Sequence, residues 1–117
     1  MVEDNFQEEW RRFLTKFSDF TGKTPTDLNP ILLLIGIQEL GKGHRYFSKE
    51  EKQDLLHIAV CKLMSYAGYY TFEGFDKDGW PHWRLVKKIP YLNLQNQEEA
   101  LKRFILEYFK KEVGWEW

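Results

Sequence analysis

The chain has 117 residues, and its 17 Lys and Arg are almost balanced by 18 Asp and Glu. This length supports one hydrophobic core and excludes a second domain. The formal net charge of -1 argues against a dedicated nucleic-acid-binding protein, because such proteins display an excess of basic side chains.

Aromatic residues make up 17% of the chain, so a core can be built without a disulfide or a metal. Cys61 is the one cysteine, which excludes an intramolecular disulfide. The polar stretch after Met1 does not resemble a secretion signal, and the longest apolar run, residues 31–37, is too short to span a bilayer. We therefore expect a cytoplasmic protein with no membrane segment and no cofactor.

Residues 4–21 predict the clearest helix of the chain. Apolar side chains recur at helical spacing and polar ones fill the opposite face, so we expect the apolar stripe to form core. Asp4 or Asn5 can cap the first turn, and Gly22 supplies the left-handed residue that commonly ends a helix. The stripe consists of Phe6, Trp10, Phe13, Leu14, Phe17 and Phe20.

A second helix is predicted from Asn29, as its cap, through Pro30 to Gly41. Its apolar residues run nearly all round, which predicts a central helix covered on most sides. The pattern from Gly36 to Gly43 resembles the start of a P-loop, but Gly43 stands where a hydroxyl must bind Mg²⁺. Strands and helices also do not alternate along this chain, so we do not expect nucleotide hydrolysis.

The loop after this helix is basic. Lys42, His44 and Arg45 lie just before a third helix, whose N-terminal amides and dipole favour an anion. The three side chains are therefore a candidate phosphate or carboxylate site. The alternative is a flexible connector whose basic side chains are solvated.

The third helix is predicted to begin at Ser48, because Ser48 and Glu51 match the capping box, and to stop near Gly68. Ile58 lies on its outward, polar side. Its inward face carries Leu55, Leu56, Ala59, Val60, Leu63, Met64 and Ala67.

Asp54, His57 and Cys61 fall at i, i+3 and i+7 on the same helix, so a carboxylate, an imidazole and a thiol can approach one another. An activated thiol and part of a metal site are two interpretations. Zinc needs more ligands than this helix offers, and a lone cysteine usually behaves as a small hydrophobe. We expect a half-buried cysteine beside a surface histidine, and no metal site.

Aromatic and β-branched runs on either side of Asp78-Gly79 predict a β-hairpin over residues 69–86. Alternation puts one set of side chains on a face expected to be core, namely Tyr70, Phe72, Trp83 and Leu85. The opposite face carries Thr71, Glu73, His82 and Arg84. Pro81 lacks a ladder donor, which suits an edge strand.

A fourth helix is predicted to start at Asn96. Leu106 lies on its outward side, where it resembles Ile58 of the third helix, and Trp115 and Trp117 follow the helix. Together these four residues suit a helix-mediated dimer. The inward side carries Leu101, Phe104, Ile105, Tyr108 and Phe109.

The predicted fold class is α+β and predominantly helical, with about four helices and a two-stranded antiparallel hairpin between the third and the fourth. Residues 1–117 are expected to form a single compact domain.

The function predicted from these patterns is that of a small intracellular protein-interaction module. We expect it to self-associate as a homodimer, or else to bind a protein partner. Aromatic and Arg side chains concentrate binding energy at interfaces, so the predicted contact residues are Trp80, Arg84, Trp115 and Trp117. The alternative is a small-ligand or phosphate-binding protein, or an enzyme, in which Lys42, His44 and Arg45 act with His82 or Trp83 lining a pocket. No catalytic residue is predicted.

Overall fold

A computed structural model describes residues 2–117, and the side chains from Asn5 onward. The predicted fold class is confirmed: the chain is α+β and mostly helical, with one antiparallel hairpin between the third and fourth helices. A short π-helical segment, η1, continues the fourth helix. The elements are α1 (Val2–Thr21), α2 (Asn29–Leu40), α3 (Lys49–Ser65), β1 (Tyr70–Phe75), β2 (Pro81–Leu85), α4 (Leu94–Tyr108) and η1 (Phe109–Val113).

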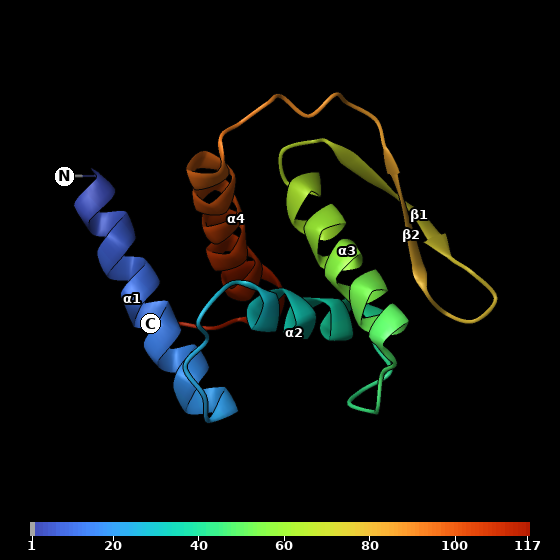
Figure 1. The fold of residues 1–117 in the computed structure, drawn as a ribbon, viewed down its shortest axis with the longest axis horizontal. Helices are drawn as coiled ribbons and strands as arrows, with labels where there is room; N and C mark the ends of the chain where they lie inside the picture. The colour runs from blue at the N-terminus through green and yellow to red at the C-terminus, as the bar shows by residue number, and fades with distance from the viewer. Residues whose placement is uncertain (1) are drawn as a thin grey trace.

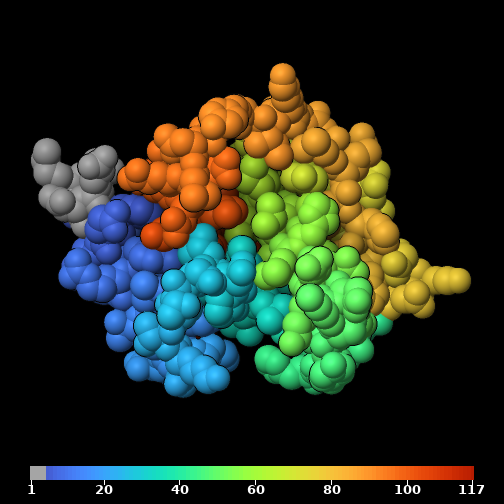
Figure 2. Space-filling view, viewed as in Figure 1, coloured from blue at the N-terminus to red at the C-terminus, as the bar shows by residue number. Residues whose placement is uncertain are grey.

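Helix α4 lies between α1 and α3, and α2 crosses one end of this layer (Figure 1). The hairpin lies on the side of α3 that faces away from α4. Residues 86–93 pass over the ends of α3 and α4 and connect β2 to α4. The space-filling view shows the hairpin turn projecting from one flank (Figure 2). None of the helices within residues 2–117 is long and apolar enough to cross a membrane.

The ends of the helices follow local chemistry. Gly41 ends α2 in the left-handed conformation, with φ 72°, and Ser48 with Glu51 forms the predicted capping box of α3. Two starts differ from the prediction. The cap of α2 is Leu28 rather than Asn29, and α4 begins at Leu94, two residues earlier than expected, where the Asn93 side chain accepts a hydrogen bond from the Asn96 amide.

The main core gathers the aromatic stripe of α1 against the three other helices. Phe13 is fully buried, and its ring lies 5.0 Å from that of Phe109 and 5.3 Å from that of Trp117. Aromatic pairs at these separations add stabilisation beyond their buried area. Phe20 departs from the prediction, because it lies in the last turn of α1 and is 65% exposed.

Ile58 and Leu106 were predicted to point outward, and this is wrong: both are 5% exposed. Both residues are buried by other elements that pack on their helices. Helix α3 is covered by the hairpin on the side opposite α4, and α4 is covered by α1 on the side opposite α3. Both helices therefore bury two faces, which the period of a single helix does not reveal.

A second, smaller core lies between the end of α2 and the start of α3. Its buried members are Leu40, Phe47, Leu55 and Ile58, with Trp80 of the hairpin packed against them. This cluster anchors the turn end of the hairpin to the helices.

The hairpin register pairs Tyr70 with Leu85 and Phe72 with Trp83, so these four residues share one face, as the alternation predicts. Beyond Phe72 the register shifts, because Glu73 forms a β-bulge and Gly74 pairs with His82. A bulge inserts one extra residue, so the alternation of side chains between the two faces shifts by one residue beyond it. Phe75 consequently joins Phe72 on the apolar face.

Candidate functional site

The apolar face of the hairpin is only partly covered by the helices. Its members Tyr70 and Trp83 are half-buried, and Pro81 is buried. Phe72 is 45% exposed, and Leu85 is 52% exposed. The prediction that this whole face is core is therefore wrong for Phe72 and Leu85.

The bulge adds Phe75 to this exposed surface. The Phe75 ring is 61% exposed and lies 5.2 Å from that of Phe72, which in turn lies 5.3 Å from the Trp83 ring. The three rings form one continuous aromatic surface, which we call the hairpin patch together with Leu85. Sequence analysis did not assign Phe75 to the apolar face, because alternation across an ideal strand does not anticipate a bulge.

The opposite face of the hairpin is polar. Arg84 donates to the Glu73 carboxylate at 2.9 Å, and both side chains are largely exposed. Arg84, a predicted contact residue, thus lies on the other face of the hairpin from the hairpin patch.

His82 lies 2.9 Å from the Asp76 carboxylate at the start of the hairpin turn. Asp76 also accepts hydrogen bonds from the amides of Asp78 and Trp80. The bond with His82 and the two amides hold the pKa of Asp76 below its ordinary value. Asp76 therefore fixes the position of the imidazole.

A cleft of about 300 Å³ separates the first half of α3 from the hairpin. Asp54 and His57 line it from α3, and Trp80, His82 and Trp83 line it from the hairpin. The Trp83 indole nitrogen is buried and has no hydrogen-bond partner within residues 5–117. The structure thus brings three predicted residues, Trp80, His82 and Trp83, to one cleft.

The three basic residues of the loop do not line this cleft. Lys42 donates to the Asp78 carbonyl in the hairpin turn, and Arg45 pairs with Glu51 at 3.3 Å while its guanidinium lies over the Phe47 ring. His44 is exposed. The capping box already uses the amides of Ser48 and Glu51 at this helix end, so these two amides are not free to bind an anion.

Cys61 is fully buried on α3, with its sulfur 3.4 Å from the His57 imidazole. Burial raises the pKa of the thiol to about 11, against a smaller opposing effect of the Tyr70 hydroxyl. A thiol with this pKa is protonated at neutral pH, so it is not an activated nucleophile. Cys61 is more buried than the expected half-buried position.

The predicted tail residues pack back on their own chain. The Trp115 ring lies 4.7 Å from that of Phe109, and the Trp117 indole donates to the Glu9 carboxylate at 3.1 Å. Both tryptophans are half-buried. Lys110 adds an ion pair with Glu9, so the tail is tied to α1.

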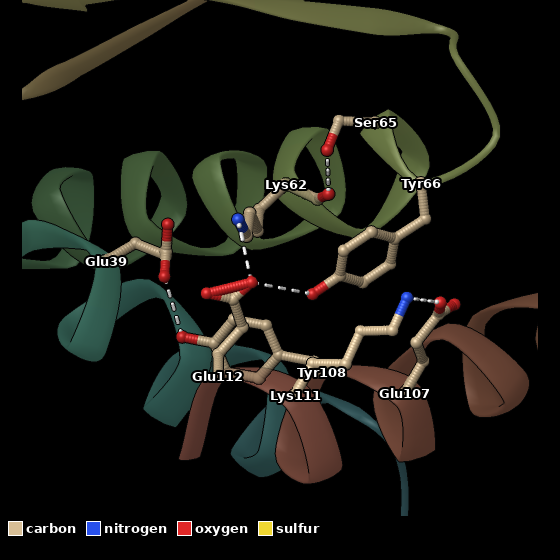
Figure 3. Close-up of polar contacts among 8 residues, drawn as sticks. All are labelled: Glu39, Lys62, Ser65, Tyr66, Glu107, Tyr108, Lys111 and Glu112. Carbon is tan, nitrogen blue, oxygen red and sulfur yellow. Dashed lines mark hydrogen bonds and ion pairs between the residues drawn. The ribbon is translucent and has the colours of Figure 1, made fainter. Parts of the chain in front are cut away.

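Figure 3 shows a polar network that sequence reasoning missed. The Tyr108 hydroxyl donates to Glu39 of α2 at 2.8 Å, and the Tyr66 hydroxyl, after α3, lies 3.4 Å from Glu112 of η1. Lys62 pairs with the same Glu112 at 3.3 Å. Sequence spacing gives no signal for this network, because its members come from distant helices.

Burial, followed by the neighbouring carboxylates, raises the pKa of both Tyr66 and Tyr108. The two hydroxyls therefore stay protonated and act as donors. The contacts join α2 to α4 through Glu39 and Tyr108, and they join the end of α3 to η1 through Glu112, which is a structural role.

Within residues 5–117, no group of three or more His, Cys, Asp or Glu side chains is arranged to hold a metal ion. Comparisons of the chain with known protein families, with curated proteins and with solved structures found no match.

Proposed function

We propose that this chain is a protein-interaction module that self-associates through the hairpin patch. The observation that carries the proposal is the continuous exposed surface of Phe72, Phe75, Trp83 and Leu85. Exposed apolar surfaces of a few hundred Å² on a monomer are often functional, and aromatic side chains concentrate interface energy.

A second copy suits this surface because the charged side chains of the hairpin strands lie elsewhere. Glu73 and Arg84 pair with each other on the polar face, and His82 is bound by Asp76. In a two-fold dimer the same patch meets itself, so any charge on it would face an identical charge. The hairpin patch avoids this repulsion.

Self-association also explains how a lone hairpin is stabilised. A two-stranded sheet is marginal in water unless its apolar face is covered. Helix α3 covers Tyr70, Pro81 and Trp83 and leaves Phe72 and Phe75 exposed. The same face of a second copy supplies the missing cover.

The predicted tail residues Trp115 and Trp117 contribute less to this proposal. Their rings are half-buried against α1 and η1, so they have less free surface to offer a partner. The interface is therefore centred on the hairpin.

The experiment is sedimentation equilibrium over a range of protein concentrations, for the natural chain and two serine variants. Phe75→Ser removes an exposed ring of the hairpin patch, whereas Phe20→Ser removes a ring of similar exposure, 65% against 61%, from α1. We expect a dimer that Phe75→Ser weakens at least ~10-fold, since interface aromatics contribute about 1.4 kcal/mol or more. Phe20→Ser is expected to leave the dimer intact.

Two results contradict the proposal. One is a natural chain that stays monomeric up to the highest concentration reached. The other is a dimer that both serine variants weaken equally, because this outcome means that the hairpin patch is not the contact.

A second candidate function is the binding of a small polar ligand in the cleft between α3 and the hairpin. The buried indole N–H of Trp83, which lacks an acceptor within residues 5–117, supports it. The phosphate form of this hypothesis has less support, since Asp54 and Asp76 also line the cleft and repel an anion.

Native mass spectrometry of protein purified without added ligands tests this second candidate. We expect additional non-protein mass on the natural chain, its loss in Trp83→Phe, which removes the donor, and its retention in Phe72→Ser. A spectrum that shows the protein mass alone contradicts a retained ligand.

A further inference from the structure

A cavity of about 370 Å³ lies between α3, α4 and the connection formed by residues 86–93. Val60 and Met64 line it from α3, Leu101 and Phe104 from α4, and Ile89 and Pro90 from the connection. Small-molecule sites are typically mostly apolar clefts of about 300–1,000 Å³. This cavity is of that kind.

The walls of the cavity carry no charged side chain. The one side-chain amide, that of Gln97, already donates to the Leu92 carbonyl at 2.6 Å. Such walls favour an alkyl chain, because a polar group buried without a hydrogen-bond partner costs free energy. Met64 adds a flexible wall, because its unbranched side chain adapts to the shape of an apolar ligand.

The rim of the cavity carries a positive charge. The Lys87 ammonium donates to the Ala67 carbonyl at 2.9 Å and lies 4.4 Å from the centre of the Tyr69 ring. Ala67 and Tyr69 both line the cavity, so these two contacts hold the ammonium next to the cavity wall. Among the side chains of residues 5–117, no carboxylate pairs with Lys87.

We propose that this cavity binds an alkyl carboxylate, with the chain between α3 and α4 and the carboxylate on Lys87. The apolar walls select the chain, and the ammonium at the rim selects a negatively charged head group. A charge-assisted hydrogen bond is roughly twice as strong as a neutral one, which favours the free acid anion over an ester or an alcohol. This site is separate from the hairpin patch and does not depend on self-association.

The experiment uses the full chain labelled with ¹³C at its methionine methyl groups and titrated with decanoate. The chain has two methionines, Met1 and Met64, and Met64 lines the cavity. We expect the Met64 signal to shift with a saturable, one-to-one dependence on decanoate. An absent or non-saturating shift of Met64 overturns the proposal.

Calorimetric titrations of three variants separate the two halves of the site. Lys87→Met keeps an apolar stem but removes the ammonium, and we expect ~10-fold weaker binding of decanoate with no change for decanol. Ala100→Phe fills the cavity from α4 and should abolish the binding of both. Lys77→Met, in the hairpin turn, is the control and should change neither.

Methyl decanoate distinguishes a free acid from an esterified acyl chain. We expect it to bind like decanol, and tighter binding of the ester than of the acid overturns the role of Lys87. If Ala100→Phe fails to fold, as judged by circular dichroism, Met64→Glu places a negative charge in the wall and should repel the acid. Decanoate binding that survives both Lys87→Met and the wall variant contradicts the proposal.

Discussion

Gly36 of α2 lies directly against the backbone of Leu55 in α3. A Cβ atom at Gly36 would stand 2.8 Å from the Leu55 carbonyl carbon and 2.9 Å from its Cβ. The two helices therefore cross at a position where only the hydrogen side chain of glycine fits. Close helix packing thus explains Gly36, the first glycine of the pattern that resembles a P-loop.

Gly36→Ala is expected to lower the free energy of unfolding by about 1–3 kcal/mol, because two helix backbones must separate to admit a methyl group. This figure is the net change, after the gain of about 1 kcal/mol that alanine brings to a helix interior. Urea denaturation measures the change. Gln38→Ala, at an exposed position of the same helix, is the control, and equal effects of the two substitutions would contradict the close contact.

The Tyr108 hydroxyl makes stability sensitive to alkaline pH. Burial and the Glu39 carboxylate raise the pKa of Tyr108 in the folded chain above its ordinary value near 10. The unfolded chain therefore loses this proton first as the pH rises. The contribution of Tyr108 is complete below about pH 10 and is lost progressively above it.

Tyr108→Phe should therefore flatten the decline of stability above pH 10 by up to about 1.4 kcal/mol per pH unit. At pH 7 the same variant should cost about 1 kcal/mol through the lost hydrogen bond to Glu39. Urea denaturation at several pH values measures both effects. An unchanged alkaline slope would show that Tyr108 titrates normally.

Cys61 should react slowly with thiol reagents. Its buried thiol has a pKa raised to about 11, so little thiolate exists at pH 8. We expect modification by a disulfide reagent to be roughly 100-fold slower than for a free cysteine, and to accelerate in urea. Rapid labelling of the folded chain would contradict the burial, and Cys61→Ala provides the blank.

Trp117→Ala should lower the free energy of unfolding by about 2–4 kcal/mol, because the indole packs on Phe13 and binds Glu9. The expected dimer should persist, because this ring faces its own chain. Thermal denaturation and sedimentation together check this. A variant of unchanged stability that loses the dimer would instead place Trp117 in the interface.

The features that sequence analysis predicted correctly have local causes. The capping box of Ser48 and Glu51 and the left-handed Gly41 depend on neighbours within a few residues. The position of Phe72 and Trp83 on one face of the hairpin follows from the alternation of side chains along its two strands.

The features that sequence analysis missed depend on distant parts of the chain. Ile58 is buried because the hairpin covers α3, and Leu106 is buried because α1 covers α4. The same limit applies to the candidate site. Alternation assigned Phe72 to a core face, but how far α3 covers that face is set by the packing of the hairpin on the helix.

The attachment of the tail to α1 has a consequence during synthesis. Lys16 donates to the carbonyl of Glu116, 100 residues away, and Trp117 reaches Glu9 across 108 residues. Such contacts form only after a long loop has closed, and they require residues 116 and 117 to have been made. A nascent chain therefore lacks these contacts until residues 116 and 117 have been made, and part of the aromatic stripe of α1 stays uncovered during that interval, when chaperones can bind it.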